Sequence, residues 1–173
     1  FIHDEPRLPP LVQAALLHYQ FETIHPFLDG NGRIGRLLIV FFLIARGRLE
    51  QPVLYLSPYF EARREEYYNA LQGVRERGDV DHWLGLFLDA VTTQANDAVI
   101  RTERLTDLRH RYRTEVHART RGIANRAVDL AITQPVLSTR LVEDSLDVSR
   151  PAALQALRRL EEAGVLTPLD PGP

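Results

Sequence analysis

The 173-residue sequence contains no cysteine and no lysine, so all of its Lys+Arg positions are arginine. The absence of cysteine excludes disulfide bonds and metal sites built on thiolates. Long apolar runs are also lacking, because the longest covers only Leu37–Ala45 and a helix needs about 20 apolar residues to span a bilayer. A formal net charge of −2 argues against a protein that binds polyanions through bulk charge. We therefore expect a soluble, cytoplasmic protein in which Leu37–Ala45 is a buried core helix.

Apolar residues recur at helical spacing along most of the chain, which predicts an all-α fold. Only residues 51–56 alternate in the manner of an extended segment. Two domains are expected, residues 1–118 and residues 119–173, and the chain is expected to begin inside a longer protein because no Met or signal peptide opens it. The expected helices begin at Pro9-Pro10, Arg33, Ser57-Pro58 and Asp79 or Asp81, followed by three short helices at about 125–133, 138–146 and 150–163.

The most informative stretch is residues 25–36, which read HPFLDGNGRIGR. Pro26 and the Gly30/Gly32 pair prevent a regular helix through its first part, and nothing then breaks a helix until Gly47. The pattern predicts a tight loop that ends at a helix N-terminus. Because first-turn N–H groups are unpaired and the helix dipole favours negative charge, such a terminus is suited to binding anions.

The residue types in this stretch indicate phosphate chemistry. Arg33 and Arg36 lie three residues apart at the helix start, where both guanidinium groups can reach neighbouring phosphates. Asp29 is a single carboxylate, which suits Mg²⁺ shared with a phosphate. His25 titrates near neutral pH and can accept a proton from a hydroxyl. Together they predict phosphoryl or nucleotidyl transfer.

The stretch resembles the signature of the Fic family (filamentation induced by cAMP), H-x-F-x-D/E-G-N-G-R-x-x-R. All of its specified positions are matched, namely His25, Phe27, Asp29, Gly30, Asn31, Gly32, Arg33 and Arg36. The similarity continues into residues 54–57 and 64–68, so that it covers roughly residues 5–118.

The resemblance implies a Fic-type helical bundle that transfers AMP from ATP to a Ser, Thr or Tyr hydroxyl of a target protein not identified by the sequence. In that scheme His25 is the general base, Asp29 holds Mg²⁺, Phe27 anchors the loop in the core, and Tyr68 lies near the adenine. Asn31 and Arg33 would bind the α- and β-phosphates, and Arg36 the γ-phosphate. The implied nucleotide-binding residues are Gly30, Asn31, Gly32, Arg33, Gly35, Arg36 and Tyr68.

Relatives that phosphorylate usually alter the glycines or the first arginine of the loop, whereas Gly30, Gly32 and Arg33 here fit the AMP-transferring pattern. Fic relatives are also commonly silenced by a helix with an S/T-x-x-x-E-G/N motif. Ser57–Glu61 and Thr139–Glu143 match it only in part and are interpreted as ordinary helix starts. We expect no Glu of this chain to pair with Arg36, and the inhibitory and target-docking elements to lie before residue 1.

Residues 125–173 resemble a winged helix-turn-helix with an incomplete wing, in which 150–163 is the recognition helix. The candidate DNA contacts are Arg150, Gln155, Arg158 and Arg159. This segment nevertheless carries more acidic than basic residues, so a protein-interaction or dimerisation module, including a homodimer, is an equal alternative. For the whole chain, two hypotheses follow: a protein adenylyltransferase, or an ATP-responsive DNA-binding transcriptional regulator with a Fic-type nucleotide site.

Overall fold

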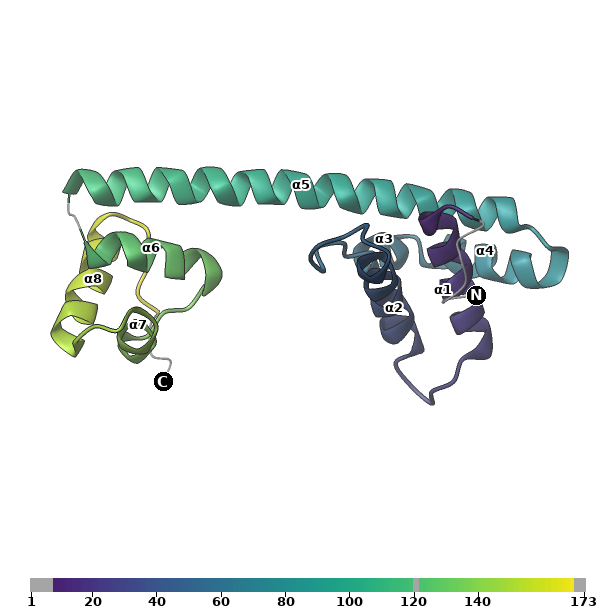
Figure 1. Cartoon of the computed structure of the whole chain (residues 1–173), viewed down its shortest axis with the longest axis horizontal. Helices are drawn as coiled ribbons and strands as arrows, with labels where there is room; N and C mark the ends of the chain where they lie inside the picture. Colours follow the sequence, from purple (N-terminus) through teal and green to yellow (C-terminus); the bar gives the residue numbers. More distant parts are fainter. Residues whose placement is uncertain (1–7, 120–121, 170–173) are drawn as a thin grey trace. The chain divides into compact units, whose positions relative to one another are not determined.

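The computed structural model describes residues 8–119 and 122–169, and every regular element in these ranges is an α-helix (Figure 1). The helices are α1 (Pro10–Ile24), α2 (Asn31–Ala45), α3 (Ser57–Ala62), α4 (Arg64–Arg77), α5 (Val80–Arg119), α6 (Ile123–Thr133), α7 (Thr139–Leu146) and α8 (Arg150–Glu162). The all-α class expected from the sequence is confirmed for the described residues. None of the helices in these ranges combines the length and apolar character that crossing a membrane requires.

Residue contacts divide the chain into two compact units, the first ending at Ile100 and the second beginning at Arg101. The division falls inside α5, which continues through it as one helix. The domain boundary at residues 118/119 stays a prediction, because it concerns where two separately evolved modules join rather than where contacts are sparse.

The core of the first unit is an aromatic and aliphatic cluster in which α1, α2, α4 and the start of α5 meet. Trp83 of α5 is fully buried and donates its indole N–H to the carbonyl oxygen of Ala15 in α1 (3.0 Å). His18 of α1 is also fully buried, and its Nε2 shares a hydrogen bond of 2.9 Å with the hydroxyl of Tyr67 in α4. Burial lowers the pKa of His18 to about 4, so the ring is neutral at pH 7. His18 is thus a polar residue of the core.

Helices α1 and α2 cross at Gly35, where there is no room for a side chain. A Cβ atom at this position would lie 2.6 Å from Glu22 Oε1 and 3.0 Å from His18 Cε1. A methyl group here would displace the Glu22 carboxylate and crowd the packed His18 ring, so Gly35 leaves a slot into which the Glu22 side chain fits.

We expect Gly35→Ala to lower the free energy of unfolding by about 1–2 kcal/mol, because crowding in a packed core outweighs the better helix propensity of alanine. Gly85 in α5 is the matched control, since no atom lies within 4 Å of its would-be Cβ, and Gly85→Ala should raise stability by about 0.5–1 kcal/mol. Urea unfolding of the two variants measures both effects. A gain in stability for Gly35→Ala equal to that of Gly85→Ala would show that the crossing is not tight.

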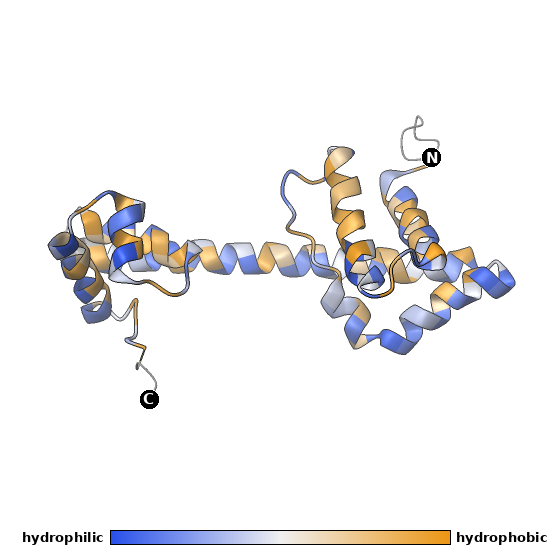
Figure 2. Cartoon of the chain, turned by 90° about the horizontal axis from the view of Figure 1, so that it is seen from below, coloured by the Kyte–Doolittle hydropathy of each residue, from blue (hydrophilic) through white to orange (hydrophobic). Residues whose placement is uncertain are grey.

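The stretch Leu37–Ala45 of α2 was expected to be a buried core helix, and this is correct for only part of its surface. Ile39 and Leu43 are buried in the core, whereas Ile34, Leu37 and Phe41 on another side of the helix are 38–55% exposed. Figure 2 shows how apolar residues dominate α2 along its length. An apolar run predicts a helix but does not show which of its faces pack against the rest of the protein.

One local expectation after α2 is also corrected. The helix expected to begin at Ser57-Pro58 is broken at Arg63, whose φ of −121° and ψ of 41° separate α3 from α4. Residues 51–56, which were expected to be extended, lie outside the helices and form no strand. Ser57 is the first residue of α3 rather than its N-cap, and its side chain makes no cap hydrogen bond. The αL conformation of Gly78 at the end of α4 agrees with the sequence.

The second unit consists of the second part of α5 and the three short helices α6, α7 and α8, close to the positions expected from the sequence. Its core is aliphatic, with Val128, Val142 and Leu160 fully buried. Asp129 of α6 accepts hydrogen bonds from Arg109 and Arg113 of α5. Partial burial raises the pKa of Asp129. The hydrogen bonds and positive charges of Arg109 and Arg113 lower this pKa by more, so that the net shift is downward.

The described part of this unit contains no β-strand, so the wing of a winged helix stays a prediction. Of the candidate DNA contacts, Arg150, Gln155 and Arg158 are exposed on α8, and Arg159 is half-buried. Helix α7 is capped by Ser138, whose hydroxyl accepts from the N–H of Leu141 (3.1 Å). Thr139 therefore lies at an ordinary helix start, as interpreted from the sequence.

Candidate functional site

The loop between α1 and α2 is held in an uncommon backbone conformation at both ends. His25 follows α1 in the αL region (φ 49°), and its N–H donates to the carbonyl oxygen of Phe21 (2.9 Å). At the other end Gly30 has φ 85° and is the N-cap of α2. A positive φ is uncommon for a residue with a side chain, and such residues concentrate at functional sites. The motif is thus a short loop that leads into a helix N-terminus, as the sequence predicts.

Asn31 determines the shape of this loop. Its side chain is buried, Oδ1 accepts from the Phe27 N–H (3.0 Å), and Nδ2 donates to the Phe27 carbonyl oxygen (2.6 Å). The expectation that Phe27 anchors the loop in the core is wrong, because Phe27 is 48% exposed and only approaches Phe21 at a ring-centroid distance of 6.3 Å. The loop is held through its backbone instead, since its polar groups need partners and Asn31 supplies two.

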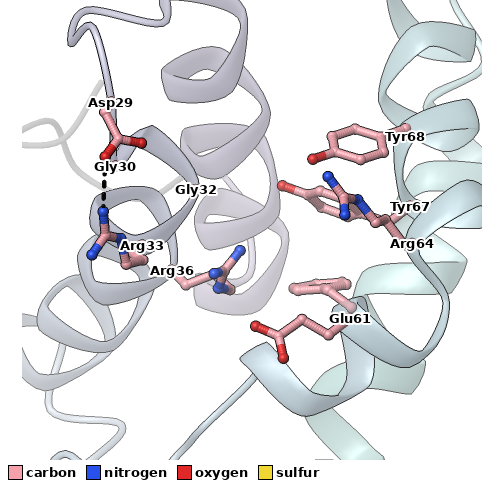
Figure 3. Close-up of a pocket in the computed structure, with 10 residues that line it drawn as sticks. Asp29, Gly30, Gly32, Arg33, Arg36, Glu61, Arg64, Tyr67 and Tyr68 are labelled. Atoms are coloured by element: carbon pink, nitrogen blue, oxygen red, sulfur yellow. Dashed lines mark hydrogen bonds and ion pairs between the residues drawn. The ribbon is translucent and has the colours of Figure 1, made fainter.

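A cavity of about 420 Å³ opens beside the N-terminus of α2 (Figure 3). This volume lies within the usual range of small-molecule sites. The cavity is lined by Asp29, Gly30, Gly32, Arg33, Arg36, Phe60, Glu61, Arg64, Tyr67 and Tyr68. Six of the sequence-predicted site residues are therefore brought together: Asp29, Gly30, Gly32, Arg33, Arg36 and Tyr68.

The α2 side of this cavity is cationic. The N–H groups of the first turn are available, because the first intrahelical bond there runs from the Ile34 N–H to the Gly30 carbonyl oxygen. Arg33 donates to Asp29 Oδ2 at 3.2 Å, but both side chains are largely exposed, so this pair contributes little and is readily exchanged for another partner.

Arg36 is held in place by a residue that the motif does not include. Its Nε donates to Ser57 Oγ in a short hydrogen bond of 2.7 Å. Within residues 8–119 and 122–169, Arg36 makes no ion pair with a carboxylate. The hydrogen bond leaves the terminal nitrogens of the guanidinium group free to face the cavity, as Figure 3 shows. Ser57 is thus a site residue missed by sequence reasoning, which assigned its hydroxyl to a helix cap.

The opposite wall is formed by α3 and α4. Tyr67 and Tyr68 are adjacent yet differ as expected, since Tyr67 is buried and Tyr68 is 54% exposed. Arg64 lies one turn before Tyr68 on the same face of α4, with its guanidinium carbon 5.6 Å from the Tyr68 ring centroid. Arg64 and Glu61 were not predicted, although the spacing of Arg64 from Tyr68 would have indicated a shared face.

The remaining predicted residues lie outside the cavity lining. His25 is at the start of the loop, with its side chain 60% exposed and Nδ1 4.0 Å from Glu22 Oε2. The Asn31 side chain is hydrogen-bonded to the backbone of Phe27, so it affects the site indirectly, by fixing the conformation of the loop. Gly35 lies at the α1–α2 crossing and is needed there for packing.

The metal expectation rests on Asp29 alone. In the described residues no three His, Cys, Asp or Glu side chains form a group that could hold a metal ion. An exposed single carboxylate fits Mg²⁺ only where substrate phosphates and water complete the coordination shell. Such shared coordination is compatible with the position of Asp29 at the rim of a cationic cavity. A site built only from protein ligands is not found among the described residues.

Comparison with known proteins identifies the same region. The family model of the Fic/DOC family matches residues 2–43. A probable protein adenylyltransferase of Aquifex aeolicus is 34% identical over 71 residues, which is 41% of this chain and 22% of that protein. Two proteins called protein adenylyltransferase Fic, from Drosophila grimshawi and Aedes aegypti, are each 38% identical, over 82 and 80 residues.

These matches cover 47% and 46% of this chain, and 16% and 15% of the two insect proteins. The chain therefore matches less than a quarter of the length of each of these relatives.

Proposed function

Because this chain belongs to the Fic/DOC family, we propose that it is an adenylyltransferase that moves AMP from ATP to a Ser, Thr or Tyr hydroxyl of a target protein. The observation that carries this proposal is the arginine-lined cavity at the N-terminus of α2, next to a loop that begins with His25. Gly30, Gly32 and Arg33 match the pattern that distinguishes AMP transfer from phosphorylation. A cytoplasmic location belongs to the same proposal.

In this proposal the phosphates of ATP lie over the first turn of α2. Unpaired N–H groups and the helix dipole favour an anion there, and Arg33 and Arg36 add two guanidinium groups. The exposed pair Arg64 and Tyr68 on the opposite wall offers an aromatic face and a cation to the nucleoside. Asn31 acts indirectly, by keeping the loop in the shape that presents these groups.

The reaction requires a proton acceptor, and we assign this role to His25. The target hydroxyl gives its proton to the imidazole as its oxygen forms a bond to the α-phosphorus. The bond from the α-phosphorus to the α–β bridging oxygen breaks, and pyrophosphate leaves. When bound with ATP, Mg²⁺ neutralises phosphate charge, and Asp29 is the residue that would hold it. The exposure of His25 gives a protein side chain access to the ring.

We expect Asp29→Asn to raise the Mg²⁺ concentration needed for half-maximal transfer by about tenfold or more, which corresponds to ~1.4 kcal/mol. The amide keeps the shape of the carboxylate but loses the charge that holds a hard cation. Titration of activity with Mg²⁺ measures the shift, and Asp89→Asn on the exposed side of α5 is the control. Identical Mg²⁺ titrations of Asp29→Asn and the wild type would remove Asp29 from this role.

The proposed function is tested by measuring pyrophosphate release from ATP·Mg²⁺ in the presence of protein acceptors. The wild type should release pyrophosphate rather than phosphate, and His25→Ala should release neither above background. Calorimetric titration with ATP·Mg²⁺ shows in parallel whether both proteins bind nucleotide. Binding by both proteins without pyrophosphate release would favour the ATP-responsive regulator instead.

A further inference from the structure

One carboxylate close to the loop is largely shielded from solvent. Glu22 lies three residues before His25, in the last turn of α1, and its side chain is 12% exposed. The sequence motif does not include it. Burying a carboxylate costs free energy unless it is paired, so its presence at this position requires an explanation.

The two oxygens of Glu22 face different surroundings. Oε1 lies in the slot above Gly35 and finds no hydrogen-bond partner among the described atoms. Oε2 lies 4.0 Å from His25 Nδ1, which is longer than a hydrogen bond but is an ion-pair distance for a protonated ring. The absence of a side chain at Gly35 is what permits the carboxylate to occupy this position.

We propose that Glu22 is the positioning residue for His25: its carboxylate faces Nδ1 of the imidazole, so that Nε2 accepts the proton of the target hydroxyl. This inference rests on the proposed function. A carboxylate on the Nδ1 side favours the tautomer with a proton on that nitrogen. It also stabilises the imidazolium that forms as the hydroxyl gives up its proton, which is a gain in the transition state rather than in the ground state.

The other charged and titratable groups that face Glu22 do not replace His25 in this pairing. From α1, His18 is buried and neutral, with a pKa lowered to about 4. From α2, Arg36 exerts a favourable electrostatic effect, and from α4, Tyr67 is a neutral phenol whose pKa is raised by burial. Burial also raises the pKa of Glu22, and the charges of His25 and Arg36 offset part of this rise. The charge of Glu22 is thus coupled to that of His25.

The test uses Glu22→Gln, which keeps the shape and removes the charge, with the exposed Glu103→Gln as the matched control. The His25 ring nitrogens are followed by NMR against pH, after assignment by their loss in His25→Ala. In Glu22→Gln we expect the His25 ring to lose its proton at lower pH than in the wild type, and the Nδ1–H tautomer to lose population. In the same variant kcat should fall about tenfold while Kd for ATP·Mg²⁺ changes less than twofold, and the pH profile of kcat should shift with the ring.

A reciprocal measurement keeps the test informative if Glu22→Gln does not fold. Coupling between two sites is symmetric, so removal of the imidazole must change the titration of Glu22 as well. In His25→Ala, at an exposed position, the Glu22 carboxyl carbon should titrate at higher pH than in the wild type. An unchanged Glu22 titration in His25→Ala, or an unchanged His25 titration in Glu22→Gln, would overturn the inference.

Failure of this inference is distinguishable from failure of the proposed function. If His25→Ala still transfers AMP, the proposed role of His25 is wrong regardless of the NMR result. If His25→Ala is inactive while the two titrations are independent, only the assignment of Glu22 is wrong.

Discussion

Replacing His25 by alanine is expected to lower the rate of AMP transfer by about 10²–10⁴-fold, which is the usual contribution of general-base catalysis. The Kd for ATP·Mg²⁺ should stay within a few-fold of the wild-type value. The reason is geometric, because the side chain is exposed at the start of the loop and is not among the residues that line the cavity. We therefore expect it to act on an incoming hydroxyl rather than on the phosphates.

The comparison requires single-turnover rates and equilibrium ATP binding for the same preparations. His82→Ala, at an exposed position near the start of α5, is the matched control and should leave both quantities unchanged. Transfer by His25→Ala at the wild-type rate would show that the proton is accepted elsewhere.

The second large effect is expected for Asn31→Ala, which removes the two hydrogen bonds that fix the loop. The backbone N–H and carbonyl oxygen of Phe27 would lose their partners, which costs about 2–3 kcal/mol of unfolding free energy for part-buried groups. The rate of transfer should fall about 10²-fold, because misplacement of reacting groups by about 1 Å has an effect of this size. Unlike His25→Ala, this variant should also bind ATP more weakly, since the loop leads into the first turn of α2.

Urea unfolding, ATP titration and transfer rates of Asn31→Ala measure these effects together. Asn96→Ala on the exposed surface of α5 controls for the loss of an asparagine side chain. The variant Asn31→Asp keeps the acceptor for the Phe27 N–H but places an oxygen against the Phe27 carbonyl, so it should remain defective. Wild-type ATP affinity in Asn31→Ala would show that the loop holds its shape without this side chain.

The loop and the helix that follows it could be predicted from the sequence because their determinants are local. Pro26 disfavours helix in the loop, and the positive φ of Gly30 is a conformation that glycine adopts without strain. The helix was expected to begin at Arg33 but begins at Asn31, so Gly32 lies in its first turn rather than in the loop. The clustering of Arg33, Arg36 and Asp29 follows from helical spacing over a few residues. Tyr68 lies far along the chain from them, and its place in the cavity was implied only by the family resemblance.

The contacts that were missed or misassigned depend on partners distant in sequence. Serine is a common helix cap, yet the hydroxyl of Ser57 accepts a hydrogen bond from Arg36, which lies 21 positions earlier. Phe27 was assigned to the core by the family resemblance, but Asn31 binds its backbone and the ring is half exposed. Glu22 shows no signal in the sequence, because its burial depends on the missing side chain of Gly35 on another helix.

The exposed apolar face of α2 illustrates the same limit at the level of a helix. Its composition predicts burial on every side, while within the first unit only one face packs against the core. Hydrophobic periodicity identifies the buried face of a helix where polar residues occupy the opposite face. Leu37–Ala45 contains no polar residue, so its buried face cannot be identified in this way.

We propose that this chain transfers the α-phosphate of ATP together with its adenosine. The most direct measurement compares ATP labelled at the α-phosphate with ATP labelled at the γ-phosphate, using the wild type and His25→Ala with the chain itself and cell-extract proteins as acceptors. We expect protein to acquire label only from α-labelled ATP, and only with the wild type. Label transferred from γ-labelled ATP would show that the γ-phosphate is transferred instead, and equal labelling with His25→Ala would show that His25 is not the base.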